Sequence, residues 1–205
     1  MAAGLAARAA SAGARTANRE LSALRGACGW WREQGWITGD PAAGLSHRHL
    51  GRPAPPLSGE QVAAVFRLPV SLREHALWRL LHDSGAPAAS VLGLDADQLD
   101  LARNRVRARD SEPSLPGAIE WRAETSRLVR WLLAGRTQGP AFLTGRRAPA
   151  ATAPADTCRA TGQGRLSYRR AAELFTGLTR PLDDAGRGWT LHQLGAGGGQ
   201  RARLA

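Results

Sequence analysis

Apolar residues recur at helical spacing from Ser71 to Leu101, and the rest of the chain can be placed relative to this stretch. Ser71 and Glu74 form a capping box, in which each side chain bonds the other residue's backbone N–H, so a helix is expected to begin at Leu72. Gly85 can adopt the positive φ that ends a helix. The apolar positions of this helix are Leu72, Ala76, Leu77, Leu80 and Leu81.

A second short helix and a strand are expected after this turn. Val91 and Leu92 lie on the short helix, which ends at Gly93. The run RNRVRAR then alternates arginine with other residues, with Val106 on the opposite face, which is typical of a strand. Four like charges on one face repel one another unless a partner neutralises them. These charges are Arg103, Arg105, Arg107 and Arg109.

The N-terminal part contains a long amphipathic helix, with Thr16 as its expected N-cap. Its apolar stripe consists of Ala17, Leu21, Leu24, Cys28 and Trp31. Its polar stripe is either a solvated face or a surface that contacts a partner, and consists of Asn18, Ser22, Arg25 and Arg32. Residues 46–56 follow and combine His, Arg and Pro without apolar periodicity, which predicts an extended linker.

Two further helices flank the central stretch. Ser58 and Gln61 form a capping box that begins a helix at residue 59. Residues 123–135 form another helix, which ends at Gly135. The expected core face of this second helix is Leu128, Trp131 and Leu132.

The last two expected helices carry charge and a glycine run. Ser167 caps a helix whose first turn exposes basic residues, and a helix N-terminus that carries arginine is a good phosphate clamp. These residues are Arg165, Arg169 and Arg170. Thr190 and Gln193 begin the final helix, but four glycines follow within residues 195–199. Each costs about 1 kcal/mol against alanine inside a helix, so the helix is expected to stop at Gly195.

Arginine is the only strongly basic residue type in the chain, because all 28 Lys and Arg residues are Arg. The formal net charge is +11. The planar guanidinium suits phosphate, so this composition favours a polyanionic partner, most simply nucleic acid. GC-rich coding is an alternative reason for the missing lysine, although it does not explain why acidic residues are few.

The sequence predicts neither a metal site nor a cofactor. Cys28 and Cys158 are isolated, and His47 and His49 lie in the linker without further ligands. No run of ~18 apolar residues could cross a membrane, and Arg8 interrupts the Ala-rich N-terminus, so no signal peptide is expected. We therefore expect a cytoplasmic protein with no membrane partner and no small-molecule substrate.

Two motifs resemble those of the tyrosine recombinases, the phage integrase family of site-specific recombinases. The stretch SGAPAASVLGLD resembles the family's T-G-x-R-x-x-E turn, with Pro87 at the position of the phosphate-gripping Arg and Ser90 at the acidic position. The stretch GWTLHQL resembles the start of the family's T-x-H-x-L-R-H helix. His192 takes the His position there, and Gly195 takes the position of the second Arg.

The resemblance implies a mainly α fold with a small antiparallel β-hairpin or sheet, which is an α+β class. It also implies a division into a partial helical core-binding domain at 1–45, a basic linker at 46–56, a truncated recombinase catalytic domain at 57–194 and a disordered Gly-rich tail at 195–205.

Most of the family's catalytic residues are missing. DNA cleavage needs a nucleophile, a general acid and cations that stabilise the phosphate. The hairpin turn contains no Lys, and Tyr168 precedes His192, whereas the family's nucleophile follows it. Only His192 survives as a catalytic position. A non-catalytic DNA-binding protein is therefore the preferred reading, and a non-functional truncated or frameshifted fragment and an active subunit completed in trans are the alternatives.

Double-stranded DNA is the expected partner, together with other recombinase subunits. The DNA contacts are expected to go mainly to phosphate and to show weak sequence specificity. The residues expected to make them are Arg25, Arg32, Arg48, Arg52, Arg105, Arg107, Arg109, Arg165, Arg169 and Arg170.

Overall fold

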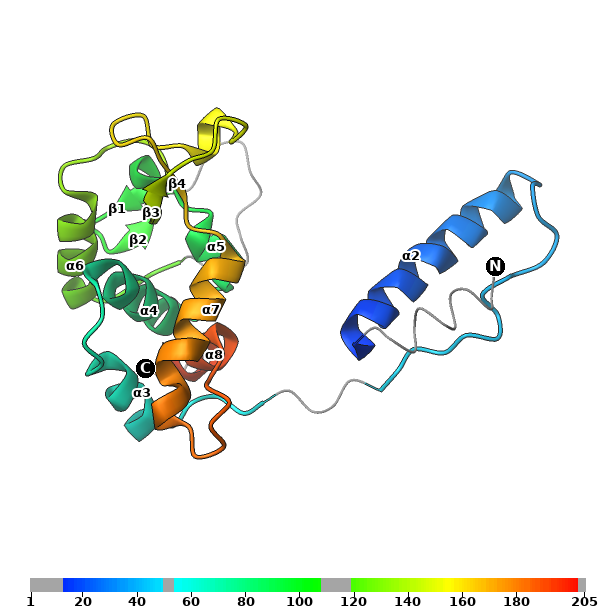
Figure 1. Ribbon diagram of the computed structural model, residues 1–205, viewed down its shortest axis with the longest axis horizontal. Helices are drawn as coiled ribbons and strands as arrows, with labels where there is room; N and C mark the ends of the chain where they lie inside the picture. The colour runs from blue at the N-terminus through cyan, green and yellow to red at the C-terminus, as the bar shows by residue number, and fades with distance from the viewer. Residues whose placement is uncertain (1–12, 50–53, 108–118, 203–205) are drawn as a thin grey trace. The chain divides into compact units, whose positions relative to one another are not determined.

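The computed structural model describes residues 13–49, 54–107 and 119–202 (Figure 1). The chain divides into two compact units, Met1–Ala54 and Pro55–Ala205. Arg52 and Arg109, two of the expected DNA contacts, lie outside the described residues.

The first unit is built on helix α2 (Ala14–Glu33). The helix begins two residues before Thr16, with Gly13 as its N-cap, so the predicted cap is wrong. The apolar stripe is confirmed at Ala17, Leu21 and Cys28, which are buried.

The polar stripe of α2 holds the first residues of the predicted linker. The Asn18 side chain donates to the Arg48 carbonyl at 2.8 Å and accepts from the Arg48 backbone N–H at 2.7 Å. Ser22 Oγ lies 3.1 Å from His47 Nε2. Residues 46–48 are therefore bound along the helix, and this stripe is a contact surface within the unit.

The second unit begins with three helices, α3 (Gly59–Phe66), α4 (Leu72–Ser84) and α5 (Ala88–Leu92). The capping box of Ser58 and Gln61 is confirmed, with hydrogen bonds of 3.2 and 2.9 Å. The box at Ser71 is wrong in detail, because the Ser71 hydroxyl donates to the Glu74 carboxylate and accepts no backbone N–H. Gly85 ends α4 with a φ of 62°, as expected.

Two short strands follow the 3-10 turn η1 (Ala96–Gln98). β1 (Leu99–Asp100) pairs antiparallel with β2 (Arg105–Val106). Arg103 lies in the turn between them, where its guanidinium is 3.2 Å from the Asp100 carboxylate. The predicted strand with Arg103, Arg105 and Arg107 on one face is therefore wrong, because only two of its residues form a strand.

Helix α6 (Ala123–Leu133) packs against α4, and the predicted core face is confirmed only in part, because Leu128 and Leu132 are half-buried against the core. Its buried residues are Thr125, Ser126, Val129 and Leu133, and Trp131 is 66% exposed. The polar pair can be buried because Thr125 donates to Asp83 at 2.6 Å and Ser126 donates to Asn104 at 2.6 Å. The predicted core position of Trp131 is wrong.

A second antiparallel pair joins β3 (Leu143–Arg147) to β4 (Gln163–Arg165), with an irregularity between Leu143 and Arg147. The segment that leads into β3 is buried at Ala141 and Phe142. The 3-10 turn η2 (Pro154–Asp156) lies in the loop between the two strands.

The chain ends with α7 (Tyr168–Thr179), the 3-10 turn η3 (Arg180–Leu182) and α8 (Leu191–Ala202). The capping box of Thr190 and Gln193 is confirmed. The predicted end of the helix at Gly195 is wrong, and so is a disordered tail over 195–202, since α8 runs through the glycine run to Ala202.

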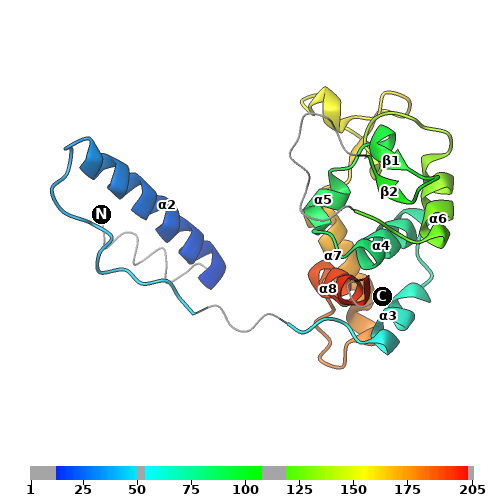
Figure 2. The ribbon, with the colours of Figure 1, turned by 180° about the vertical axis from the view of Figure 1, so that it is seen from behind.

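Helix α4 lies at the centre of the second unit, between α6 and α8 (Figures 1 and 2). Trp78 of α4 is 1% exposed and packs edge-on against Phe175 of α7, with ring centroids 5.1 Å apart. The expected class, mainly α with small antiparallel sheets, is confirmed. Within the described residues, no helix is long and apolar enough to span a membrane.

Candidate nucleic-acid interface

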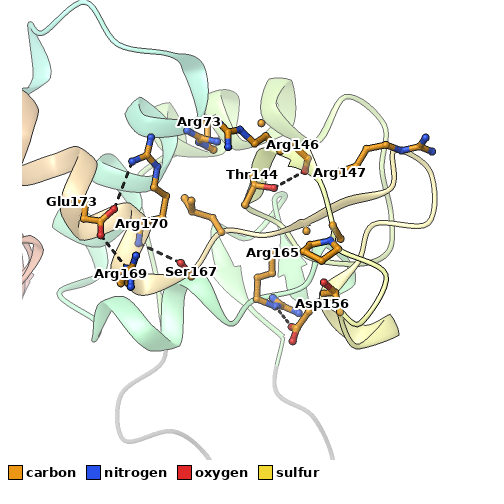
Figure 3. Close-up of a pocket in the computed structure, with 16 residues that line it drawn as sticks. Arg73, Thr144, Arg146, Arg147, Asp156, Arg165, Ser167, Arg169, Arg170 and Glu173 are labelled. Carbon is orange, nitrogen blue, oxygen red and sulfur yellow. Dashed lines mark hydrogen bonds and ion pairs between the residues drawn. The ribbon is translucent and has the colours of Figure 1, made fainter.

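An arginine-lined hollow of about 940 Å³ opens between β3, β4 and the first turns of α4 and α7 (Figure 3). Its lining side chains come from segments that are distant in sequence. We call it the arginine hollow, and its six arginines are Arg73, Arg146, Arg147, Arg165, Arg169 and Arg170. Two acidic residues, Asp156 and Glu173, also line it.

The N-terminus of α7 forms one wall of the arginine hollow. Ser167 is extended, and its Oγ accepts the Arg170 backbone N–H at 3.3 Å, which confirms the predicted cap. The first turn of α7 contains no acidic residue. Its free N–H groups and the helix dipole therefore favour an anion at this end.

Glu173 partly neutralises the two arginines of this wall. Its carboxylate lies 3.0 Å from Arg169 Nε and 3.6 Å from Arg170 Nη1. Both arginine side chains remain exposed, at 89% and 59%. One carboxylate cannot neutralise two guanidinium groups, so this end of α7 keeps a positive charge.

Arg165 has a structural role. Its guanidinium donates to Asp156 and Asp95, each at 2.7 Å, and to carbonyls that include those of Gly93 and Ala155. Burial disfavours its charge, but the hydrogen bonds and charges of Asp156 and Asp95 raise the pKa of Arg165 above its ordinary value. Every N–H of this guanidinium already has an acceptor, so Arg165 is removed from the expected phosphate contacts.

Arg73, in the first turn of α4, is held in the wall of the hollow by two hydrogen-bond partners. Its Nε donates to the Glu74 carboxylate at 2.8 Å, and its Nη1 donates to the Leu143 carbonyl at 3.0 Å. Although burial raises the pKa of Glu74, the hydrogen bonds from Ser71 and Arg73 and the Arg73 charge lower it below its ordinary value. The ion pair therefore stays charged and joins α4 to β3.

Sequence reasoning missed Arg73, Arg146 and Arg147. Arg146 and Arg147 are exposed and come shortly after the buried segment before β3. A pair of basic residues directly after a buried segment is the sequence feature that could have identified them. Arg147 lies over Gly162 of the opposite chain segment. No local signal marks Arg73, because only the fold brings α4 to β3.

The other expected DNA contacts lie elsewhere. In the first unit, Arg25 donates to the Leu45 carbonyl at 2.6 Å and lies 3.4 Å from His47 Nδ1, so it holds the linker, and Arg32 and Arg48 are exposed. In the second unit, Arg105 is exposed in β2 and Arg107 is exposed directly after it.

The positions that resemble the family's catalytic residues meet at the junction of α4, α5 and α8. Pro87 is the N-cap of α5, and His192 is exposed in the first turn of α8. A Cβ on Gly195 would lie 3.7 Å from the Ala86 carbonyl oxygen, so α8 brings Gly195 close to the residue before Pro87. Proline and glycine carry no cation, so this corner has only an imidazole to offer a phosphate.

Tyr168 lies apart from this corner, as the first residue of α7, and is 52% exposed. Within the described ranges, no three His, Cys, Asp or Glu side chains lie close enough together to hold a metal ion.

No protein-family profile matches the sequence. A tyrosine recombinase XerC of Azotobacter vinelandii is 37% identical over 99 residues, which is 45% of this chain and 33% of the relative. The XerC of Neisseria gonorrhoeae is 33% identical over 94 residues, which is 42% of this chain and 31% of the relative. The chain thus spans about a third of the length of the curated relatives that it matches.

The fold has known counterparts. The integrase of transposon Tn1549, solved in complex with a circular intermediate DNA, superimposes with a TM-score of 0.60 at 13% identity. The superposition covers 93% of this chain and 67% of the integrase. The chain is therefore similar in sequence to XerC tyrosine recombinases over part of its length, and it shares the fold of the Tn1549 integrase.

Proposed function

We propose that this chain binds double-stranded DNA and does not cleave it. The observation that carries the proposal is the arginine hollow, where exposed Arg146, Arg147, Arg169 and Arg170 surround the N-terminus of α7. Arginine forks and free helix N–H groups are the donors that contact DNA phosphates in proteins. The Tn1549 integrase, which has the same fold, was solved with DNA.

The absence of cleavage follows from the residues at the junction of α4, α5 and α8. Stabilising the reacting phosphate requires cations at the positions of Pro87 and Gly195, and neither residue supplies one. Tyr168 is the exposed first residue of α7, next in sequence to Ser167 and Arg169 of the arginine hollow, and we propose that it packs locally or contacts the DNA backbone. His192 alone provides no nucleophile.

Duplex binding can be tested by fluorescence anisotropy with a labelled 30-bp duplex at several salt concentrations. If Z phosphates are neutralised, log affinity should fall against log salt with a slope of about −0.9Z. Arg169→Ala and Arg170→Ala should each flatten the slope by about one unit and weaken unrelated duplexes alike.

Arg67→Ala is the matched control, because Arg67 is also exposed but lies at the end of α3, outside the arginine hollow. It should leave the slope unchanged. A folded sample that does not bind duplex at about 50 mM salt, or whose affinity does not depend on salt, would contradict the proposal and favour a non-functional fragment.

A further inference from the structure

The outward face of α6 carries an exposed tryptophan beside two exposed arginines. Trp131 is 66% exposed, and Arg127 and Arg130 are exposed as well. Residues three and four positions apart share a helix face, so Arg127 lies next to both of the others. Tryptophan and arginine are strongly enriched at the energetic centres of protein interfaces.

A pocket of about 440 Å³ adjoins this face, and we call it the leucine-lined pocket after its three leucines, although Asp97 and Asp100 line it as well. Arg136 braces it, because its guanidinium donates to the carbonyls of Pro140 at 2.8 Å and Ala141 at 3.1 Å. The pocket is therefore a preformed feature of the fold. Its apolar side chains include Leu99, Leu101 and Leu133, and its exposed cations are Arg107 and Arg130.

The cations of this surface are not used inside the described part of the chain. Arg127 and Arg130 form no ion pair or hydrogen bond there through their side chains, unlike Arg169 and Arg170, which share Glu173. The nearby acids are Asp97, Asp100 and Glu124, and the Asp100 carboxylate is already paired with Arg103, 3.2 Å away. The surface therefore keeps a positive charge next to an apolar pocket.

We propose that this surface, formed by Arg107, Arg127, Arg130, Trp131 and the adjoining leucine-lined pocket, binds an acidic segment of another protein that inserts an apolar side chain into the pocket. Carboxylates complement the unpaired guanidinium groups, and an aliphatic side chain complements the leucines and the indole. A DNA duplex offers phosphates but no side chain for the pocket. A second copy of this chain, with its net charge of +11, complements a positive surface less well than an acidic segment does.

The test measures, by fluorescence anisotropy, how the full chain binds a labelled synthetic peptide. The peptide consists of glutamates with leucine at every third or fourth position. Trp131→Ala and Arg130→Glu should each weaken peptide binding about tenfold or more. A peptide with serine in place of leucine should also bind about tenfold more weakly. The control Arg67→Ala should bind the original peptide like the wild type.

Three results would overturn the proposal. The first is equal peptide binding by all variants, or no binding up to about 1 mM peptide. The second is loss of duplex affinity in the α6 variants with peptide binding intact, which would assign the surface to DNA. The third is a dimer in sedimentation that Trp131→Ala dissociates, which would make a second copy the occupant. Thermal melting of each variant checks the fold, and duplex binding measured in parallel separates this proposal from the DNA-binding proposal.

Discussion

Gly198 of α8 lies directly against the carbonyl oxygen of His82, in the last turn of α4. A Cβ at residue 198 would overlap the His82 backbone, so the two helices can approach this closely only through glycine. The glycine run, which the sequence reading took as a helix stop, is therefore a packing surface of α8. His82 Nδ1, 3.2 Å from the Leu194 carbonyl, ties the same two helices together.

Because of this contact, two glycine-to-alanine substitutions in α8 should have different effects on stability. Gly198→Ala should lower the free energy of unfolding by about 1–3 kcal/mol, because the overlap forces α8 away from α4. Gly195→Ala should be neutral or stabilising, since its Cβ would meet the Leu81 and Ala86 carbonyls at 3.7 Å, an ordinary contact, and alanine gains up to about 1 kcal/mol in a helix. Urea denaturation of both variants measures the difference. Equal stabilities would contradict this packing of α8.

Arg165 offers a second test of stability, because it joins β4 to two separate segments through Asp156 and Asp95. Arg165→Ala leaves both carboxylates without their cation and should lower the free energy of unfolding by about 2–3 kcal/mol. This is at or below the low end of the range for breaking a buried ion pair, because the Arg165 side chain is 18% exposed. Arg146→Ala, in the same hollow but exposed, should change stability by less than about 0.5 kcal/mol. Melting temperatures and urea midpoints check both values. A stable Arg165→Ala variant with a reduced salt slope for duplex would return Arg165 to the DNA contacts.

These two cases show where sequence reasoning succeeds and where it fails. The caps at Ser58, Ser167 and Thr190 were predictable, because each depends on residues within three positions of one another. Arg165 was misread because its partner Asp95 lies 70 residues away. Basic residues near a helix N-terminus look alike in sequence whether they face a phosphate or an internal carboxylate.

Helix α6 illustrates the same limit for hydrophobic patterns. Its sequence allows two helical faces, one through Leu128 and Trp131 and one through Val129 and Leu133. The second is fully buried, because Asp83 and Asn104 satisfy the polar residues beside it, and the first is only partly buried, at Leu128. A hydrophobic pattern cannot include those distant partners, and the exposed tryptophan was therefore unpredictable.

Glu74 should make stability depend on acid. The pKa of Glu74 is lowered in the folded chain. The stability that its carboxylate contributes is therefore fully present above the pKa of the unfolded chain, about 4.3, and is lost as the pH falls through the lower pKa of the folded chain. Glu74→Gln cannot ionise, so its melting temperature should be below that of the wild type at pH 7 and should fall less between about pH 5 and pH 3. Parallel melting curves for the two proteins over this range would show that the carboxylate carries no such linkage.

The strongest test of lost catalysis is to restore the missing cations. Pro87→Arg alone, and Pro87→Arg combined with Gly195→Arg, should form no covalent protein–DNA adduct on a suicide duplex, because a nucleophile and a general acid are still missing and residues of one catalytic unit act together. The added arginines should instead strengthen duplex binding and make the salt slope steeper, by about one unit for each phosphate gained. Adducts are read on denaturing gels, with thermal melting to confirm that each variant is folded. An adduct that disappears with Tyr168→Phe would identify Tyr168 as a nucleophile and overturn the assignment of this chain as a non-cleaving DNA-binding protein.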